Sequence, residues 1–294
     1  MAKYTLTQFR HDFPDDDACL LYLFKKRWGQ HGPICTCGKR GDFHRVTSRR
    51  SFACAWCGAQ LSPTAGTIFD HSPTPLSLWF YAMFVMCAAK NGVAALELKR
   101  QLGVTYKTAW RIAHAIRKLM EDDTDPDQLK GVIEGDETYV GGRRKGGKRG
   151  RGAPGKTPLV GYVERGGRVR VKVIPQVTTR QVFRFLYLNV EKGAKLYTDE
   201  LAVYSYAKPW GYDHDRVNHR RAEYVRGLVH TNTIEGFWSQ LKRSIDGTHH
   251  HVSSWWLRRY AAEHAWRYSR RHSVDPLFLS LLDRVTASLP VRAA

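Results

Sequence analysis

The sequence lacks long apolar runs. No window approaches the roughly 18–20 consecutive apolar residues that a membrane-spanning helix requires. The first residues, Met1-Ala-Lys-Tyr4, lead into polar sequence without the apolar core of an export signal. We therefore expect a cytoplasmic protein with no membrane partner. We also find no internal repeat, which argues against a solenoid or a propeller.

Acidic residues are scarce. The chain of 294 residues has 27 Asp and Glu against 47 Lys and Arg, which gives a formal net charge of +20. A compact fold with so large a surplus repels itself unless a polyanion shares its surface. A basic protein without such a partner is the alternative, but nucleic acid is the usual partner of a domain of this kind. The composition therefore favours a protein that binds nucleic acid.

Cysteine is also rare, and the six cysteines are unevenly placed. Cys19 and Cys87 stand alone in apolar helical patterns, which is typical of core residues. The other four are clustered with short spacings in a chain that we expect to remain in a reducing compartment. Such clustering favours a metal site over disulfides.

The clustered cysteines form two knuckles around two short strand-like segments, 42–46 and 50–53. This pattern predicts a zinc ribbon, in which four thiolates surround one structural Zn²⁺; the candidate ligands are Cys35, Cys37, Cys54 and Cys57. The second knuckle has the standard Cys-x₂-Cys spacing. The first is one residue shorter, so His31 or His44 could replace Cys35 as the fourth ligand.

Helical patterns surround the ribbon. Acidic residues after Pro14 open a helix that Gly29 ends. The apolar segment 75–89 predicts a buried helix, and the segments 95–103 and 105–117 predict two helices that are broken at Gly103. The last two resemble a helix-turn-helix, whose second helix enters the major groove of DNA. The candidate contacts on that helix are Tyr106, Lys107 and Arg111.

After the acidic segment 121–127 the pattern becomes mixed α/β. Strands are predicted at 132–140, 159–163, 169–174 and 194–198, and helices at 179–190 and 232–245. We therefore divide the chain into an N-terminal helix (1–30), a zinc ribbon (31–72), a helical DNA-binding domain (73–122), a linker (123–130), an α/β domain (131–272) and a C-terminal tail (273–294).

Three acids in the α/β domain suggest chemistry. Asp136 lies inside a strand between apolar neighbours, Asp199 ends a strand, and Glu235 lies one turn into a helix. Each alone is more often a structural or solvated residue. Together, in a basic chain, they are the hard oxygen ligands that two metal ions need for phosphodiester chemistry. We predict an active site with two Mg²⁺ or Mn²⁺ ions.

Candidate DNA-binding and supporting residues accompany these acids. Lys242 shares a helix face with Glu235, and Arg243 follows it. A glycine-rich basic segment after the first strand predicts a phosphate clamp; its cations are Arg143, Arg144, Lys145, Lys148 and Arg149. His230 and Asn232 precede Glu235 and could position a metal-bound water.

These motifs carry a resemblance. The segments Gly135-Asp136-Glu-Thr-Tyr-Val-Gly-Gly142, Tyr197-Thr-Asp199-Glu and His230-Thr-Asn-Thr-Ile-Glu235, followed by Lys242, resemble the DDE transposases of prokaryotic insertion sequences. The likeness is closest to the family with an N-terminal zinc ribbon, and it extends from about residue 13 to residue 272. It implies an RNase H-like catalytic domain at 131–272, with Asp136 and Asp199 on strands and Glu235 on the following helix.

The same resemblance implies the activity. Such an enzyme binds the terminal inverted repeats of its element, cuts by metal-activated water and joins the freed 3′-OH ends to target DNA. The expected partner is double-stranded DNA, bound by a homodimer or a higher homo-oligomer, and the expected location is the nucleoid of a prokaryotic cell.

Three other interpretations remain at this point. A transposase-derived zinc-ribbon protein that only binds DNA would have no reason to keep the three acids. A metal-dependent nuclease that cuts without joining fits the sequence as well. His264-Ala-Trp-Arg267 matches a string found in tyrosine recombinases, but Tyr268 follows it immediately instead of lying on a separate helix, so we treat the match as chance.

Overall fold

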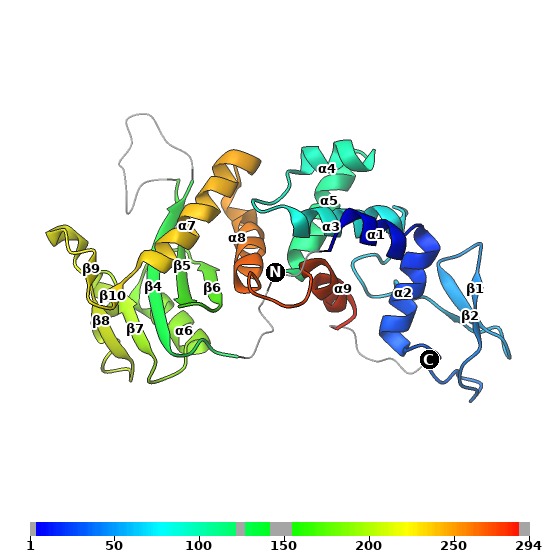
Figure 1. The fold of residues 1–294 in the computed structure, drawn as a ribbon, viewed down its shortest axis with the longest axis horizontal. Coiled ribbons are helices and arrows are strands. Elements are labelled where there is room, and N and C mark those ends of the chain that lie inside the picture. Colours follow the sequence, from blue (N-terminus) through cyan, green and yellow to red (C-terminus); the bar gives the residue numbers. More distant parts are fainter. Residues whose placement is uncertain (1–3, 122–126, 142–154, 288–294) are drawn as a thin grey trace. The chain divides into compact units, whose positions relative to one another are not determined.

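The computed structural model describes residues 4–121, 127–141 and 155–287. The chain forms two compact units. Unit 1 contains the residues up to Lys90, Ala95–Leu119 and the residues from Ser273 onward; unit 2 contains Asn91–Ala94 and Met120–His272. Each unit is described separately below, with the element labels of Figure 1.

Unit 1 begins with two helices where the sequence predicted one. Helix α1 (Leu6–Asp12) has a capping box formed by Thr5 and Gln8, and α2 spans Asp16–Trp28. The Asp15 side chain accepts a hydrogen bond from the Ala18 backbone and so begins α2. Gly29 ends it, as predicted, with φ +77°.

The ribbon follows α2 as a three-stranded antiparallel sheet. Its strands are β1 (Phe43–Val46), β2 (Ser51–Cys54) and β3 (Gln60–Leu61), in the order β1-β2-β3. Phe24 of α2 packs on Phe52 with ring centroids 4.4 Å apart, which attaches the ribbon to the helical part of unit 1. The predicted strand pair between the two cysteine knuckles is confirmed.

Helix α3 (Leu76–Ala88) is the centre of unit 1, and its side chains Trp79, Phe80 and Met83 are fully buried. Its N-cap, Pro75, provides no side-chain hydrogen bond. The carboxylate of Asp16 instead accepts hydrogen bonds from the Leu76 and Ser77 backbone N–H groups, each at 2.9 Å. An acid of one helix therefore caps another helix.

The predicted helical pair is confirmed. Helix α4 (Ala95–Leu102) ends at Gly103, which has φ +66°, and α5 spans Tyr106–Leu119. The Thr105 hydroxyl accepts a hydrogen bond from the Thr108 N–H and begins α5.

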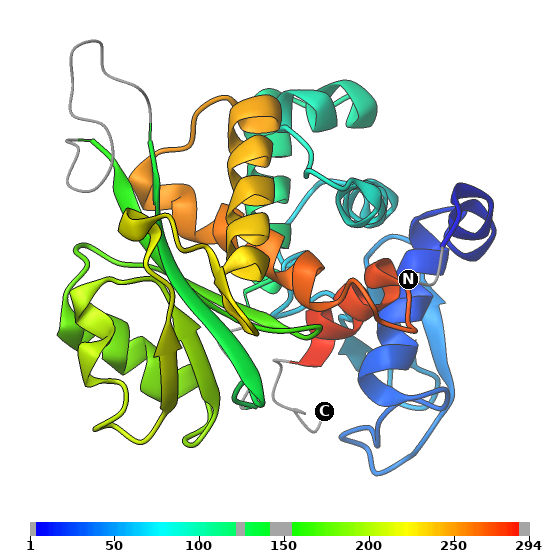
Figure 2. The ribbon, with the colours of Figure 1, turned by 60° about the vertical axis from the view of Figure 1, so that its left-hand side comes forward.

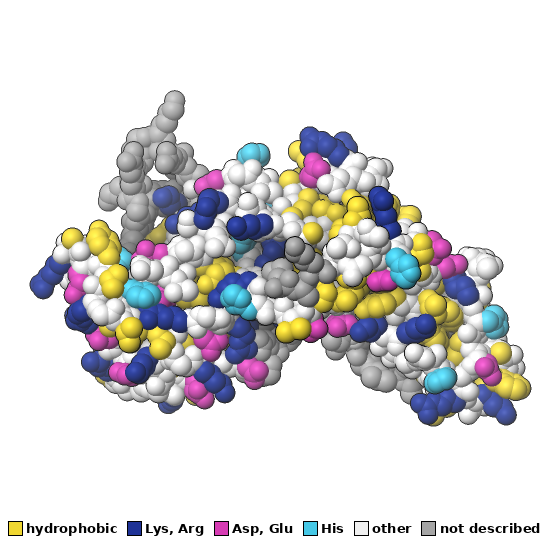
Figure 3. All heavy atoms as spheres, in the orientation of Figure 1, with side chains coloured by type: hydrophobic (Ala, Val, Ile, Leu, Met, Phe, Trp, Pro, Cys, Tyr) yellow, Lys and Arg dark blue, Asp and Glu magenta, His cyan; other side chains and the backbone are white. Residues whose placement is uncertain are grey.

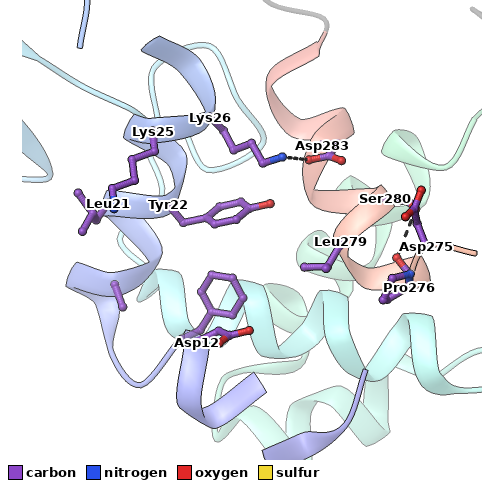
Figure 4. A pocket seen from close by; sticks show the side chains of 12 residues that line it. Asp12, Leu21, Tyr22, Lys25, Lys26, Asp275, Pro276, Leu279, Ser280 and Asp283 are labelled. Carbon is purple, nitrogen blue, oxygen red and sulfur yellow. Dashed lines mark hydrogen bonds and ion pairs between the residues drawn. The ribbon is translucent and has the colours of Figure 1, made fainter. Parts of the chain in front are cut away.

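The C-terminal segment, predicted as a tail, contains helix α9 (Leu277–Ala287). Phe278, Leu281 and Leu282 are buried on it, so α9 belongs to the core of unit 1. Lys26 of α2 forms an ion pair with Asp283 at 2.6 Å. Both residues, together with Tyr22, line a cavity of about 640 Å³ (Figure 4).

Unit 2 is built on a mixed five-stranded sheet (Figure 1). The strand order is β6 (Val169–Val173), β5 (Thr157–Glu164), β4 (Val132–Val140), β7 (Lys195–Thr198) and β8 (Asp213–Arg216). The pairs β6–β5 and β5–β4 are antiparallel, whereas β4–β7 and β7–β8 are parallel. All four strands predicted from the sequence are present, and β8 was not predicted.

Helices cover both faces of this sheet (Figure 2). Helix α6 (Thr179–Asn189) packs Phe183 and Leu186 with Ile133, whereas α7 (Asn232–Ser244) and α8 (Ser254–Ser269) form a separate core on the other side. The remaining elements are short: η1 (Ala202–Tyr206), η2 (His219–Arg221), the hairpin β9 (Val225–Arg226) and β10 (Val229–His230), and the π-helical turn η3 (Ile245–His249).

The second half of the expected linker, 123–130, is packed in unit 2. Residues 122–126 lie outside the described residues, but Leu129 is fully buried and forms a β-bridge with Val190. Residues 127–130 therefore belong to unit 2, because the apolar side chain of Leu129 completes the core beneath α6.

No helix in the described ranges is both long and apolar enough to span a membrane. Lys and Arg side chains are spread over the face shown in Figure 3, with fewer Asp and Glu side chains between them. This surface agrees with the basic composition.

Candidate active site and zinc site

The two cysteine knuckles bring four sulfur atoms together. Cys35 Sγ lies 3.4 Å from Cys57 Sγ, and Cys37 Sγ lies 3.9 Å from Cys54 Sγ; all four lie within 4.8 Å of one another. A tetrahedron with Zn–S bonds of about 2.3 Å has S···S edges of about 3.8 Å. The four thiols therefore fit one structural Zn²⁺.

Cys35 belongs to this cluster despite the shortened first knuckle. Gly38 has φ +80° and donates its backbone N–H to the Cys35 carbonyl at 2.8 Å, which closes a tight turn. The Cys37 backbone N–H and the neighbouring thiols lower the pKa of the Cys35 thiol to about 6, so its thiolate is favoured. Within the described part of the chain, the group includes neither His31 nor His44.

Asp136 lies in the middle of the central strand β4, opposite Gly161 of β5. Burial raises the pKa of its carboxyl well above the usual range, and the charges of Glu137, Asp199 and Glu235 raise it further. The fold therefore brings the three predicted acids close enough for their charges to interact. Such crowding of carboxylates is costly unless a cation or a proton is shared among them.

Asp199 and Glu235 come from the neighbouring elements. Asp199 follows β7, the parallel neighbour of β4; it is buried, and it accepts a hydrogen bond from the Leu201 N–H at 2.9 Å. Glu235 is in the first turn of α7, where the Thr231 hydroxyl donates to its Oε1 at 2.6 Å. The carboxylates are not as tightly grouped as the four sulfurs.

A cavity of about 370 Å³ opens between β4 and α7. Its lining includes Asp136 and Glu235 and, two turns along α7, Lys242. The sequence spacing predicted that Glu235 and Lys242 share a helix face, and the structure confirms it. The cavity is open, and both acidic and basic side chains line it.

Comparisons with known proteins identify the chain. Residues 128–269 match the ISXO2-like transposase domain, and residues 14–60 match the transposase zinc-ribbon domain. The chain belongs to this family of insertion-sequence transposases. It is 28% identical over 244 residues to an uncharacterized protein in transposable element ISH50 of Halobacterium salinarum, and the match covers 77% of this chain and 81% of that protein.

Membership has direct consequences. A transposase moves a DNA element, so this chain is a DNA-transposing enzyme that binds DNA, and its ribbon is a zinc-binding domain. The sequence resemblance to transposases with an N-terminal zinc ribbon is confirmed.

The other residues predicted to contact DNA lie in different environments from one another. Tyr106 and Lys107 are exposed at the start of α5. Arg111 is exposed as well, but one nitrogen of its guanidinium donates to the Ser72 hydroxyl at 3.1 Å and the group lies over the Trp79 ring, so it is partly held within unit 1. The basic segment that contains Arg143, Arg144, Lys145, Lys148 and Arg149 lies outside the described residues.

The structure also reveals neighbours of the site that the sequence analysis missed. Glu134, two residues before Asp136, is completely buried and contacts the start of α7. His219 of η2 lies 3.9 Å from Glu235, and its backbone N–H donates to Glu200 at 2.9 Å. A buried glutamate in an apolar strand was a usable signal for the first, but no local pattern marked the second.

The two residues proposed to support a metal-bound water have different positions. His230 Nδ1 lies 3.2 Å from Glu134 Oε1, and Asn232 is exposed at the first position of α7. His230 therefore faces the buried glutamate.

The recombinase-like string on α8 is part of the interior. His264 and Arg267 are buried, and Arg267 forms an ion pair with Glu263 in the same helix. Burial and the charge of Arg267 lower the pKa of His264 to about 4, so it is neutral near pH 7. These residues stabilise α8, which agrees with the interpretation of the match as chance.

Proposed function

We propose that Asp136, Asp199 and Glu235 are the metal-binding residues of an RNase H-like catalytic domain. The observation that carries the proposal is that acids from β4, the end of β7 and α7 lie close enough for their charges to interact, and that two of them, Asp136 and Glu235, line one open cavity. The strand order, with three antiparallel strands followed by two parallel ones, supports the RNase H-like assignment.

The donor set fits Mg²⁺ or Mn²⁺. Carboxylate oxygens are the hard ligands that these ions take, and they come here from three separate elements. Burial raises the pKa of Asp136, and the neighbouring charges of Glu137, Asp199 and Glu235 raise it further, which supports a site where a cation would be favoured. Two divalent ions would relieve this repulsion, and the carboxylates would hold them.

The residues of the chain hold the metal ligands and the DNA in position for the reaction. When bound, the two metal ions activate the attacking oxygen and stabilise the leaving oxygen of the phosphodiester. Thr231 orients the Glu235 carboxylate through its hydroxyl. Lys242, on the same cavity wall, holds a phosphate next to the bond that is cut.

The proposed activity is cleavage at the terminal inverted repeats, followed by joining of the 3′-OH ends to target DNA. Contacts to the DNA by Tyr106, Lys107, Arg111, Arg243 and the basic segment at 143–149 remain part of this proposal, as does a dimer or higher oligomer on DNA. The neutralised phosphates make the affinity strongly dependent on salt.

Incubation with DNA that carries the ends of the element tests this function. In Mg²⁺ or Mn²⁺ we expect both nicked ends and joined products, scored separately. Nicked ends without joined products would reduce the enzyme to a nuclease, and binding without either product would remove the catalytic assignment.

Lys242→Ala should slow cleavage mainly by misplacing the strand. Geometric errors of about 1 Å can cost on the order of 100-fold in rate. Overall affinity should fall only modestly, and the slope of log affinity against log salt should flatten by about one unit or less. Single-turnover cleavage and salt titrations measure both.

Lys130→Ala is the matched control for the loss of one positive charge, because Lys130 is exposed in the same unit. It should cleave at the wild-type rate. A folded Lys242→Ala protein that also cleaves at the wild-type rate would show that Lys242 only solvates the helix.

A further inference from the structure

Glu134 is a buried carboxylate with an unusual set of partners. Its side chain has no solvent exposure, and its position on β4 is two residues before Asp136, so both side chains point to the same face of the sheet. That face is covered by α7. A buried, charged residue is costly unless hydrogen bonds and opposite charges compensate it.

Both oxygens of Glu134 are occupied by donors. Oε2 accepts the backbone N–H groups of Thr233 at 2.7 Å and Ile234 at 3.1 Å. Oε1 accepts the Thr233 hydroxyl at 2.8 Å and Arg165 Nε at 2.6 Å. A carboxylate with two donors on each oxygen is poorly suited to bind a metal ion, which separates Glu134 from the three acids beside it.

The two backbone donors have a specific position in α7. Its N-cap is Thr231, so Thr233 and Ile234 are the second and third residues of the helix. These are the N–H groups that an N-cap side chain normally satisfies. Thr231 makes no such hydrogen bond: its backbone, with φ −116° and ψ 15°, is not in the extended conformation usual for an N-cap residue, and its hydroxyl donates to Glu235. Glu134 therefore supplies the cap that Thr231 does not.

Arg165 extends the same network. Besides its 2.6 Å contact with Glu134, it donates to the carbonyls of Leu228 at 2.8 Å and His230 at 3.1 Å. The hairpin that leads into α7 is thereby tied to the same carboxylate. The beginning of α7 is fixed to β4 by charge-assisted hydrogen bonds, which are stronger than neutral ones.

We propose that Glu134 is a positioning residue: it caps α7 from strand β4 and thereby holds Glu235 opposite Asp136. The inference rests on the proposed function of Asp136 and Glu235 as metal-binding residues. The Glu134 carboxylate sets the separation of β4 and α7 at the place where each contributes a metal ligand. Residues that orient metal ligands typically change metal affinity or activity by about 10- to 100-fold when replaced.

Glu134→Gln in the full-length, zinc-loaded protein tests this role. The amide keeps the shape but offers one acceptor oxygen to donors that two oxygens served, so the network is weakened, and Glu134→Ala removes the cap altogether. We expect faster hydrogen exchange at the Thr233 and Ile234 amides, binding of Mn²⁺ about 10- to 100-fold weaker by EPR titration, and a similar loss in single-turnover cleavage. DNA affinity should stay within about twofold, since phosphate contacts elsewhere supply it.

Glu263→Gln is the matched control. Glu263 is also buried in unit 2 and paired with an arginine, but its partner lies on α8. This variant should have lower thermal stability and an unchanged Mn²⁺ affinity.

Thr231→Val and Thr231→Ser test the hydrogen bond from Thr231 to Glu235 without removing a buried charge. The valine variant should bind Mn²⁺ more weakly than the wild type. The serine variant, which keeps the hydroxyl, should bind Mn²⁺ as the wild type does.

These experiments distinguish failure of the positioning role of Glu134 from failure of the proposed metal site. Unchanged exchange at Thr233 and Ile234 in a folded Glu134→Ala protein would overturn the cap. Faster exchange with unchanged Mn²⁺ affinity, in a protein whose Asp136→Ala variant loses Mn²⁺ binding, would overturn the positioning role alone. If Asp136→Ala binds Mn²⁺ as the wild type does, the proposed metal site fails, and the positioning role fails with it.

Discussion

Replacing any one of Asp136, Asp199 or Glu235 with alanine should reduce cleavage by about 1,000-fold or more, because residues that act as a unit in the chemical step cannot be removed singly without losing most of the effect. DNA binding should be nearly intact, since affinity comes from the basic surface. Single-turnover cleavage of end DNA and a binding titration at one salt concentration measure the two quantities.

Glu137→Gln is an informative companion to these variants. Glu137 lies next to Asp136, but its side chain contacts Tyr204, and Tyr204 packs in the core with α6, on the other face of the sheet. We expect it to cleave far better than Asp136→Ala. An alanine variant of one of the three acids with near wild-type cleavage would remove that acid from the site.

Removing zinc should unfold the ribbon. A structural zinc ion contributes about 10 kcal/mol or more to the folding of such a small domain. Chelation, or the change of Cys54 and Cys57 to Ser, should make residues 31–72 sensitive to proteolysis and weaken binding to specific ends. The sheet of unit 2 has its own core and should remain folded.

The ligand set can be tested in the same experiment. Because all four sulfurs are grouped, Cys35→Ser should lose zinc as completely as Cys57→Ser, whereas His31→Ala and His44→Ala should keep one zinc ion per chain. Cys87→Ala, outside the cluster, is the control. Purified protein without zinc by elemental analysis would contradict the ribbon assignment.

Much of the fold was predictable because the local patterns agree with the tertiary structure. The strand at 132–140 and the helix from Asn232 were predicted to within about a residue, since their apolar residues face real cores. Helix α9 was missed because its core is completed by residues of α3, more than 180 positions earlier. Strand β8, with the sequence Asp-His-Asp-Arg, has no apolar pattern and forms by pairing with β7.

The candidate site was partly predictable for a similar reason. Asp136, Asp199 and Glu235 are marked by strong local motifs, and Lys242 by helical spacing. An acid in an apolar strand is visible in the sequence, but the role of Glu134 depends on partners that are 31 to 100 residues away, namely Arg165, Thr233 and Ile234. Long-range hydrogen bonds leave no periodic trace in a chain.

The most direct test of the central claim is to locate Mn²⁺ in crystals of the protein by its anomalous scattering. We predict signal flanked by the carboxylates of Asp136, Asp199 and Glu235, on the wall of the cavity that includes Lys242, and no such signal in Asp136→Ala. Manganese bound elsewhere, or bound there without contact to all three acids, would contradict the account.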